Sequence, residues 1–188
     1  MGQHSPRAVA SVLSTVLLVA VVVVLAATVS VFAFDIGAGV DGEAPVVSQS
    51  SGTLSADVAG SNDQIVRLTH QAGDTLDVSN LEIAVDASTA CGMSGRLVNL
   101  PAPGGDPQPT TEYVRGDDLF DNSANSVSGP IGEDGVTVDG RWSAGETATF
   151  RIANGACSLS PGDAITVRVV HTPSGAVLIE KTLTAQLP

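Results

Sequence analysis

The stretch 164–187, AITVRVVHTPSGAVLIEKTLTAQL, predicts two strands separated by a tight turn. Apolar and β-branched residues alternate with polar ones over Ala164–His171 and again over Ala176–Leu187, which is the pattern of half-buried strands. Between them, residues 172–175 (TPSG) are all turn formers. The end of the chain is therefore expected to be β-structure.

The same pattern continues towards the N-terminus. Turn-forming sequences separate four further predicted strands, and no helical period of useful length interrupts them. About six to eight strands at this spacing predict an antiparallel β-sandwich of the immunoglobulin-like kind over residues 53–188. The four additional strands are expected at Gln64–His70, Leu81–Ala87, Gly135–Asp139 and Thr147–Ala153.

A long apolar segment, Ala8–Phe34, precedes this region and contains no charged residue. Its length of about 27 residues exceeds the roughly 20 that a helix needs to cross a bilayer. The segment therefore predicts a single transmembrane helix, with Arg7 and the amino terminus inside and the C-terminal domain outside the cell. Two other interpretations stay open, a cleaved secretory signal and an ordinary signal anchor.

The charges are divided as sharply as the apolar residues. All 20 acidic residues lie at or beyond Asp35, and the chain has a net charge of −12. Such a charge disfavours nucleic acid and anionic lipid headgroups as partners. Asp outnumbers Glu, and Lys181 is the only lysine. Dense carboxylates hold water and cations at high salt, whereas long lysine stems expose apolar surface, so this composition indicates a salt-adapted, halophilic source. An ordinary acidic extracellular protein is the alternative.

Cys91 and Cys157 are the only two cysteines, and they do not form a CxxC motif. In an exported domain two cysteines usually pair, and this pair would close a long loop. We therefore expect a disulfide, with two free buried thiols as the alternative. Neither cysteine has the neighbours that a structural metal site requires, so no metal is expected there.

No arrangement of residues in the sequence indicates catalysis. No serine lies in a GxSxG motif, and aromatic residues, which often line substrate clefts, make up only 3% of the chain. Asp117, Asp118 and Asp121 form a small acidic cluster, but their spacing does not match a calcium-binding EF-hand loop. We expect a non-enzymatic protein without a cofactor, in which this cluster is a solvated loop; weak cation binding is the alternative.

Several segments resemble archaeal type IV pilins. The N-terminal part of the resemblance comprises residues 6–13 (PRAVASVL), 17–20 (LLVA) and 25–27 (LAA). The remaining part consists of three strand and turn segments: residues 66–76 (VRLTHQAGDTL), 141–146 (RWSAGE) and 160–163 (SPGD).

The resemblance implies a division of the chain into four parts. Residues 1–8 would be a leader, removed by a prepilin peptidase between Ala8 and Val9, and residues 9–34 would be the retained helix. Residues 35–52 would form a hinge and residues 53–188 the extracellular domain. Small side chains would let neighbouring helices approach closely in a filament. These residues are Ala10, Ser11, Ser14, Ala20, Ala26, Ala27 and Ser30.

The sequence thus predicts an α+β protein, with a long N-terminal transmembrane and assembly helix followed by an antiparallel β-sandwich. The resemblance implies a homopolymeric pilus-like filament, built by the pilus assembly machinery from subunits that wait in the membrane. Surface adhesion or cell–cell contact would be its task. The alternative is a single-pass, membrane-tethered extracellular binding domain that does not polymerise.

Overall fold

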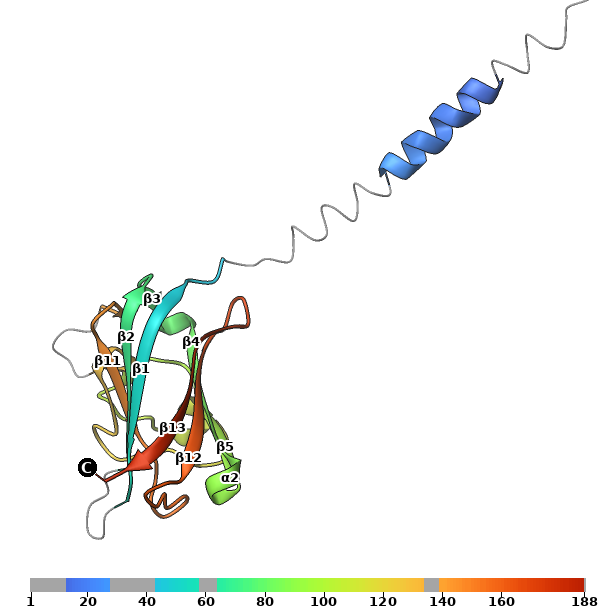
Figure 1. Cartoon of the computed structure of the whole chain (residues 1–188). Coiled ribbons are helices and arrows are strands. Elements are labelled where there is room, and N and C mark those ends of the chain that lie inside the picture. The colour runs from blue at the N-terminus through green and yellow to red at the C-terminus, as the bar shows by residue number, and fades with distance from the viewer. Residues whose placement is uncertain (1–12, 28–42, 58–63, 134–138, 188) are drawn as a thin grey trace, which may run out of the picture. The chain divides into compact units, whose positions relative to one another are not determined.

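The protein, seen in a computed structural model, divides into two units, Met1–Gly42 and Glu43–Pro188. In the described residues, the first unit contributes one helix and the second contributes every strand (Figure 1). The structure describes residues 13–27, 43–57, 64–133 and 139–187.

The second unit consists of strands with short helical turns between some of them. Its strands are β1 (Val47–Ser55), β2 (Ile65–Gly73), β3 (Leu76–Asp77), β4 (Leu81–Ala87), β5 (Met93–Leu97), β6 (Ala102–Pro103), β7 (Val114–Gly116), β8 (Val127–Ser128), β9 (Gly132–Glu133), β10 (Arg141–Trp142), β11 (Thr147–Arg151), β12 (Ala164–His171) and β13 (Ala176–Gln186). The helical turns are α2 (Ser88–Cys91), α3 (Thr110–Tyr113), η1 (Val78–Asn80) and η2 (Gly129–Ile131).

Nine of these strands form one sheet in the order β7-β5-β4-β12-β13-β1-β2-β11-β8. All neighbours in it are antiparallel except β1 and β13, which pair in parallel through Leu54 with Ala185 and Ser55 with Gln186. Figure 1 shows β1 and β13 meeting at one end and diverging towards the other. The sheet therefore curls, and its two halves enclose the apolar core.

Alternating side chains fill this core from both halves of the sheet. Along β12, partly buried and buried residues alternate without a break, as expected for a strand with one face inward. Leu68 from β2 and Val167 from β12 belong to the same buried cluster although they lie in different halves. Phe120 packs edge-on against Phe150, with 5.8 Å between the ring centroids, and Trp142 is fully buried.

The expected fold class is wrong in two respects. First, the structure shows an N-terminal helix over residues 13–27, about 15 residues, which at about 1.5 Å per residue spans about 22 Å; the other parts of the predicted helix, 9–12 and 28–34, lie outside the described residues. No helix in the described part of the chain combines the length and apolarity needed to cross a membrane. The predicted transmembrane helix over residues 9–34 is therefore corrected.

Second, the protein is mostly β rather than α+β, and its main strands form a single curled nine-stranded sheet. A sandwich with two separate antiparallel sheets was expected instead. The parallel contact between β1 and β13 makes the difference, because it joins the two halves into one hydrogen-bonded sheet.

Individual strands agree more closely with the sequence. The predictions for Leu81–Ala87 and Ala164–His171 are confirmed by β4 and β12, and β13 ends one residue before the predicted Leu187. Most of the strand expected at 135–139 lies outside the described residues. Strand β1 begins at Val47, inside the stretch 35–52 that was assigned to a hinge.

Candidate functional site

The most unusual surface of the described chain is that of the N-terminal helix. Residues 13–27 contain no charged side chain, and Leu and Val occur on every side of the helix. Their exposed fractions run from 50% at Val21 to 68% at Leu17. An α-helix that is apolar all round is normally buried, so this surface is suited to contacts with other molecules.

One side of this helix has an apolar hollow of about 280 Å³ around Ala20. The larger side chains at its rim include those of Leu17 and Val24, and the small methyl group of Ala20 leaves space between them. A side chain of a neighbouring helix can enter such a space, as knobs enter holes in packed helices.

The predicted small residues do not form a single stripe along the helix. Ala27 lies two turns after Ala20 and shares its face, whereas Ser14 and Ala26, each six residues from Ala20, point about 120° away on opposite sides. Close approach is therefore available on three sides of the helix. The other predicted site residues lie outside the described residues, namely Ala8, Val9, Ala10, Ser11 and Ser30.

The predicted disulfide is confirmed: Cys91 and Cys157 are bonded, with 5.5 Å between their Cα atoms. The bond joins α2, on the β4–β5 connection, to the segment between β11 and β12, and it closes a loop of 66 residues. Cys157 is buried, and Cys91 is partly buried. The bridge therefore fixes two connections that belong to different parts of the curled sheet.

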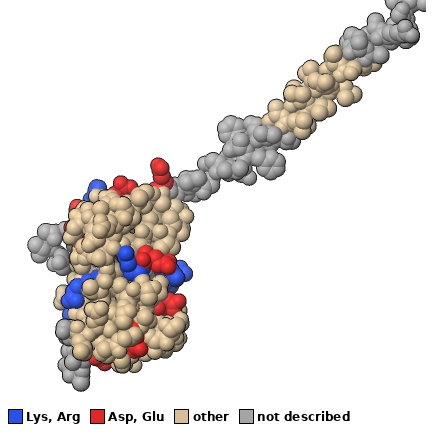
Figure 2. Space-filling model, in the orientation of Figure 1, with Lys and Arg blue, Asp and Glu red and all other residues tan. Residues whose placement is uncertain are grey.

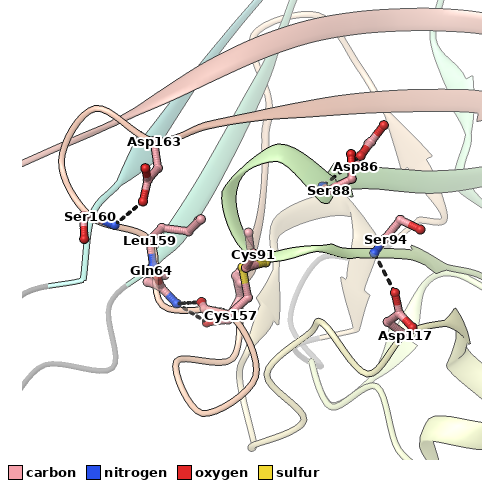
Figure 3. Close-up of a disulfide and its surroundings, with 11 residues drawn as sticks. Gln64, Asp86, Ser88, Cys91, Ser94, Asp117, Cys157, Leu159, Ser160 and Asp163 are labelled. Atoms are coloured by element: carbon pink, nitrogen blue, oxygen red, sulfur yellow. Dashed lines mark hydrogen bonds between the residues drawn. A yellow bond between two sulfur atoms is a disulfide. The ribbon is translucent and has the colours of Figure 1, made fainter.

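Gln64 holds the same segment from the other side, as Figure 3 shows. Its fully buried amide Nε2 donates to the carbonyl oxygen of Cys157 at 2.7 Å and to that of Ile152 at 3.4 Å. Its Oε1 accepts a hydrogen bond from the backbone N–H of Leu159. A single side chain thus satisfies three backbone groups beside the disulfide, a role that sequence reasoning missed.

Several carboxylates in the acidic loops bind backbone N–H groups. Asp117 accepts from the N–H of Ser94 at 2.8 Å, and Asp121 accepts from that of Ser123 at 2.9 Å. No group of three or more His, Cys, Asp or Glu residues placed to hold a metal ion occurs among the described residues. The carboxylates of Asp117 and Asp121 therefore help to shape their own loops.

Charged side chains of both signs lie next to each other on the β unit. Figure 2 shows positive and negative residues side by side across the middle of the visible face. Hydrogen bonds from the Ser88 side chain and backbone, together with the nearby Arg168 guanidinium, hold the pKa of Asp86 below its usual value. Asp86 therefore stays ionised beside a hollow that is bordered by arginines.

In comparisons with known proteins, the sequence matches no protein-family model. A search of curated proteins gives no match either. The resemblance to archaeal type IV pilins therefore stays a prediction.

Proposed function

We propose that this protein is the structural subunit of an extracellular, type IV pilus-like filament of the archaeal kind, assembled through its N-terminal helix. The observation that supports this most is the helix surface over residues 13–27, which is uncharged and exposed on every side. Surface adhesion or contact between cells is the task proposed for the filament.

Burial of this surface favours a bundle of like helices. Burying a Leu or Val side chain fully contributes about 1.5–3 kcal/mol, so such a helix gains most when neighbours cover all its faces. A single flat partner would cover one face only. The small residues on three sides, Ser14, Ala20 and Ala26, allow several neighbouring helices to approach closely.

Copies of one chain can surround each other in this way if each contact is heterologous. In a heterologous contact, one face of a helix binds a different face of the next copy, so the first and last copies of a row each keep a free face. The contact therefore repeats and produces a helical filament unless it closes into a ring. The hollow at Ala20 supplies one such face, and the exposed side chains of Leu18 and Val22, on the opposite side of the helix, supply the complement.

The β unit has the properties expected of the outer layer of such a filament. Its disulfide suits an oxidising environment outside the cell. Its acidic residues keep it soluble, and its buried core lets it fold around its own apolar residues. In this proposal the helix provides the assembly contacts and the β unit provides the surface.

The direct test is to shear surface filaments from cells that make the protein and to examine them by electron microscopy and mass spectrometry. We expect the protein to be the main component, to retain residues 13–27 and, as the resemblance implies, to begin at Val9. Recovery of only soluble monomers without the helix would contradict the proposal. A full-length chain that stays on the cell as single molecules would instead favour the tethered binding domain.

A matched pair of variants tests the role of the helix. Ala20→Asp places a carboxylate in the apolar hollow and is expected to abolish filaments, because the charge would have to be buried without a partner. Thr53→Asp adds the same charge at an exposed position of β1 and should leave filaments intact. Normal filaments from Ala20→Asp cells would show that this helix face is not buried on assembly.

A further inference from the structure

Three arginines form a row across the outer face of one half of the sheet. In the strand register, Arg168 of β12 lies opposite Ala84 of β4, Ala84 opposite Arg96 of β5, and Arg96 opposite Arg115 of β7. Residues opposite each other on neighbouring strands point to the same face. The chain has only 8 basic residues, and this arginine row (Arg96, Arg115 and Arg168) brings three of them together on one face.

The row borders a hollow of about 350 Å³. Ala84 lies in the middle of the row, and its methyl group leaves the space between Arg168 and Arg96 unfilled. Ser94 and Gly116 also line the hollow; Ser94 has a short side chain, and Gly116 has none. A group the size of a carboxylate side chain can therefore reach the guanidinium groups from outside.

Three carboxylates already lie beside the row: Glu82 and Asp86 line the same hollow, and Glu180 pairs with Arg168, so they match the three arginines in number. Arg168 pairs with Glu180 at 2.8 Å, and Arg96 forms a looser pair with Glu82 at 3.6 Å. All four side chains are at least a quarter exposed, and exposed pairs of this kind exchange readily because they contribute little to stability.

Arg115 is placed differently from the other two arginines. It takes part in neither of the ion pairs found among the described residues. Its Nη1 donates to the backbone carbonyl oxygens of Thr111 and Val114, at 2.7 and 3.0 Å. A guanidinium has five N–H donors in a planar fork, so donors remain for a carboxylate that approaches from solvent.

We propose that the arginine row binds surface carboxylates of a second copy of this chain. The charge balance supports this partner, because 20 acidic residues against 8 basic ones make carboxylates the most abundant charged group on any copy. Two copies with a net charge of −12 repel each other, and a carboxylate meets less repulsion at the row, where arginines match the carboxylates in number, than on the rest of the acidic surface. The inference rests on the proposed filament, which would hold β units of neighbouring copies side by side.

Such contacts would also survive concentrated salt. At about 1 M salt the Debye length is about 3 Å, which removes long-range attraction and repulsion between exposed charges. Direct guanidinium–carboxylate pairs, which are bidentate and hydrogen-bonded, depend less on that long-range field. The arginine row would therefore select the relative position of neighbouring β units, while the helices supply the adhesion between subunits.

The test is photo-cross-linking in filaments of the full chain, with a benzophenone amino acid at Ser94 on the rim of the hollow. We expect cross-links to Asp- or Glu-containing peptides of a second copy. The yield should fall by about tenfold in an Arg96→Glu/Arg115→Glu double variant, because like charges then face each other. The single variant Arg115→Glu should also lower the yield, and Arg67→Glu, which makes the same change of charge on the exposed face of β2 in the other half of the sheet, is its control and should keep the yield.

The outcomes separate this inference from the proposed function. Filaments that form normally but give no cross-link from position 94 to a second copy would contradict the proposed role of the arginine row. The filament proposal would be unaffected. Cross-links to an acidic cell-surface polymer instead of a second copy would overturn it equally. Absence of filaments from unaltered cells would overturn the proposed function, and this inference with it. The milder Arg96→Gln/Arg115→Gln variant should reduce the cross-link yield too, and an unchanged yield in it would count against the row.

Discussion

The two described units use the same apolar residue types in opposite ways. Leu68 in β2 is 0% exposed, whereas Leu17 in the N-terminal helix is 68% exposed. The β unit buries its apolar residues within its own curled sheet, and the helix presents them outward. The difference teaches that one chain can bury apolar residues for its own folding in one part and leave them exposed in another. Under the proposed function, the β unit carries the folding free energy and the helix supplies the assembly surface.

Removal of the disulfide should have the largest effect on the unfolding free energy, and this effect should be confined to the β unit, which contains both cysteines. Closing a loop of 66 residues stabilises the folded state by about 4 kcal/mol in the chain-entropy estimate. The Cys91→Ala/Cys157→Ala variant should lose about that much in urea unfolding of the detergent-held chain, followed by fluorescence of the single, buried Trp142. Reducing agent should shift the unaltered protein and leave the variant unchanged; equal urea midpoints for the two proteins would contradict the prediction.

The same substitution in both units tests the contrast directly. Leu68→Ala removes a fully buried side chain and should cost about 2–5 kcal/mol of unfolding free energy. Leu17→Ala removes the same atoms from an exposed position and should leave the urea midpoint of the β unit unchanged. A similar loss from Leu17→Ala would show that the helix contributes to the fold of the β unit, and the division of roles would fail.

The sequence was sufficient for the strands whose pattern is local. β4 and β12 each bury every second residue, and their β-branched, largely alternating sequences were enough to predict their bounds. β1 has the sequence VSQSSGTLS, in which polar residues and glycine outweigh apolar ones, and its first six residues fell within the stretch 35–52 that was assigned to a hinge. Its pairing with β2 and with the end of β13, rather than its own pattern, makes it a strand.

The site residues show the same limit. With only two cysteines in the chain, their pairing followed from the expectation that the domain is exported. The arginine row could not be predicted, because Arg96, Arg115 and Arg168 come together only through the register of four strands. The predicted membrane-spanning helix rested on an uncharged run, and the helix seen over residues 13–27 does not have the length and apolarity needed to cross a membrane.

Gln64 offers a smaller effect, confined to the β unit. Gln64→Leu keeps much of the side-chain volume but leaves the N–H of Leu159 and the carbonyl of Cys157 without their partner. Unsatisfied buried groups of this kind cost about 1–3 kcal/mol, so we expect a loss of about 2 kcal/mol by urea unfolding. Gln71→Leu, at an exposed position of β2, is the matched control and should change little. Equal midpoints for the two variants would mean that water replaces the amide of Gln64.

The smallest expected effect is a pH dependence at Asp86, on the rim of the arginine row. Ser88 hydrogen bonds and the Arg168 guanidinium lower the pKa of this carboxyl in the folded protein, below the usual value of about 3.9 in the unfolded chain. A lowered folded pKa means that the ionised group stabilises the fold above about pH 4 and that this contribution is lost as the pH falls further. Asp86→Asn keeps an acceptor for Ser88 but removes the charge.

The urea midpoints of unaltered protein and Asp86→Asn should therefore differ slightly at pH 6 and converge as the pH is lowered towards about 3. Asp118→Asn removes the same charge from an exposed loop position and controls for the overall net charge. A constant difference across this range would show that the ionisation of Asp86 is not coupled to folding.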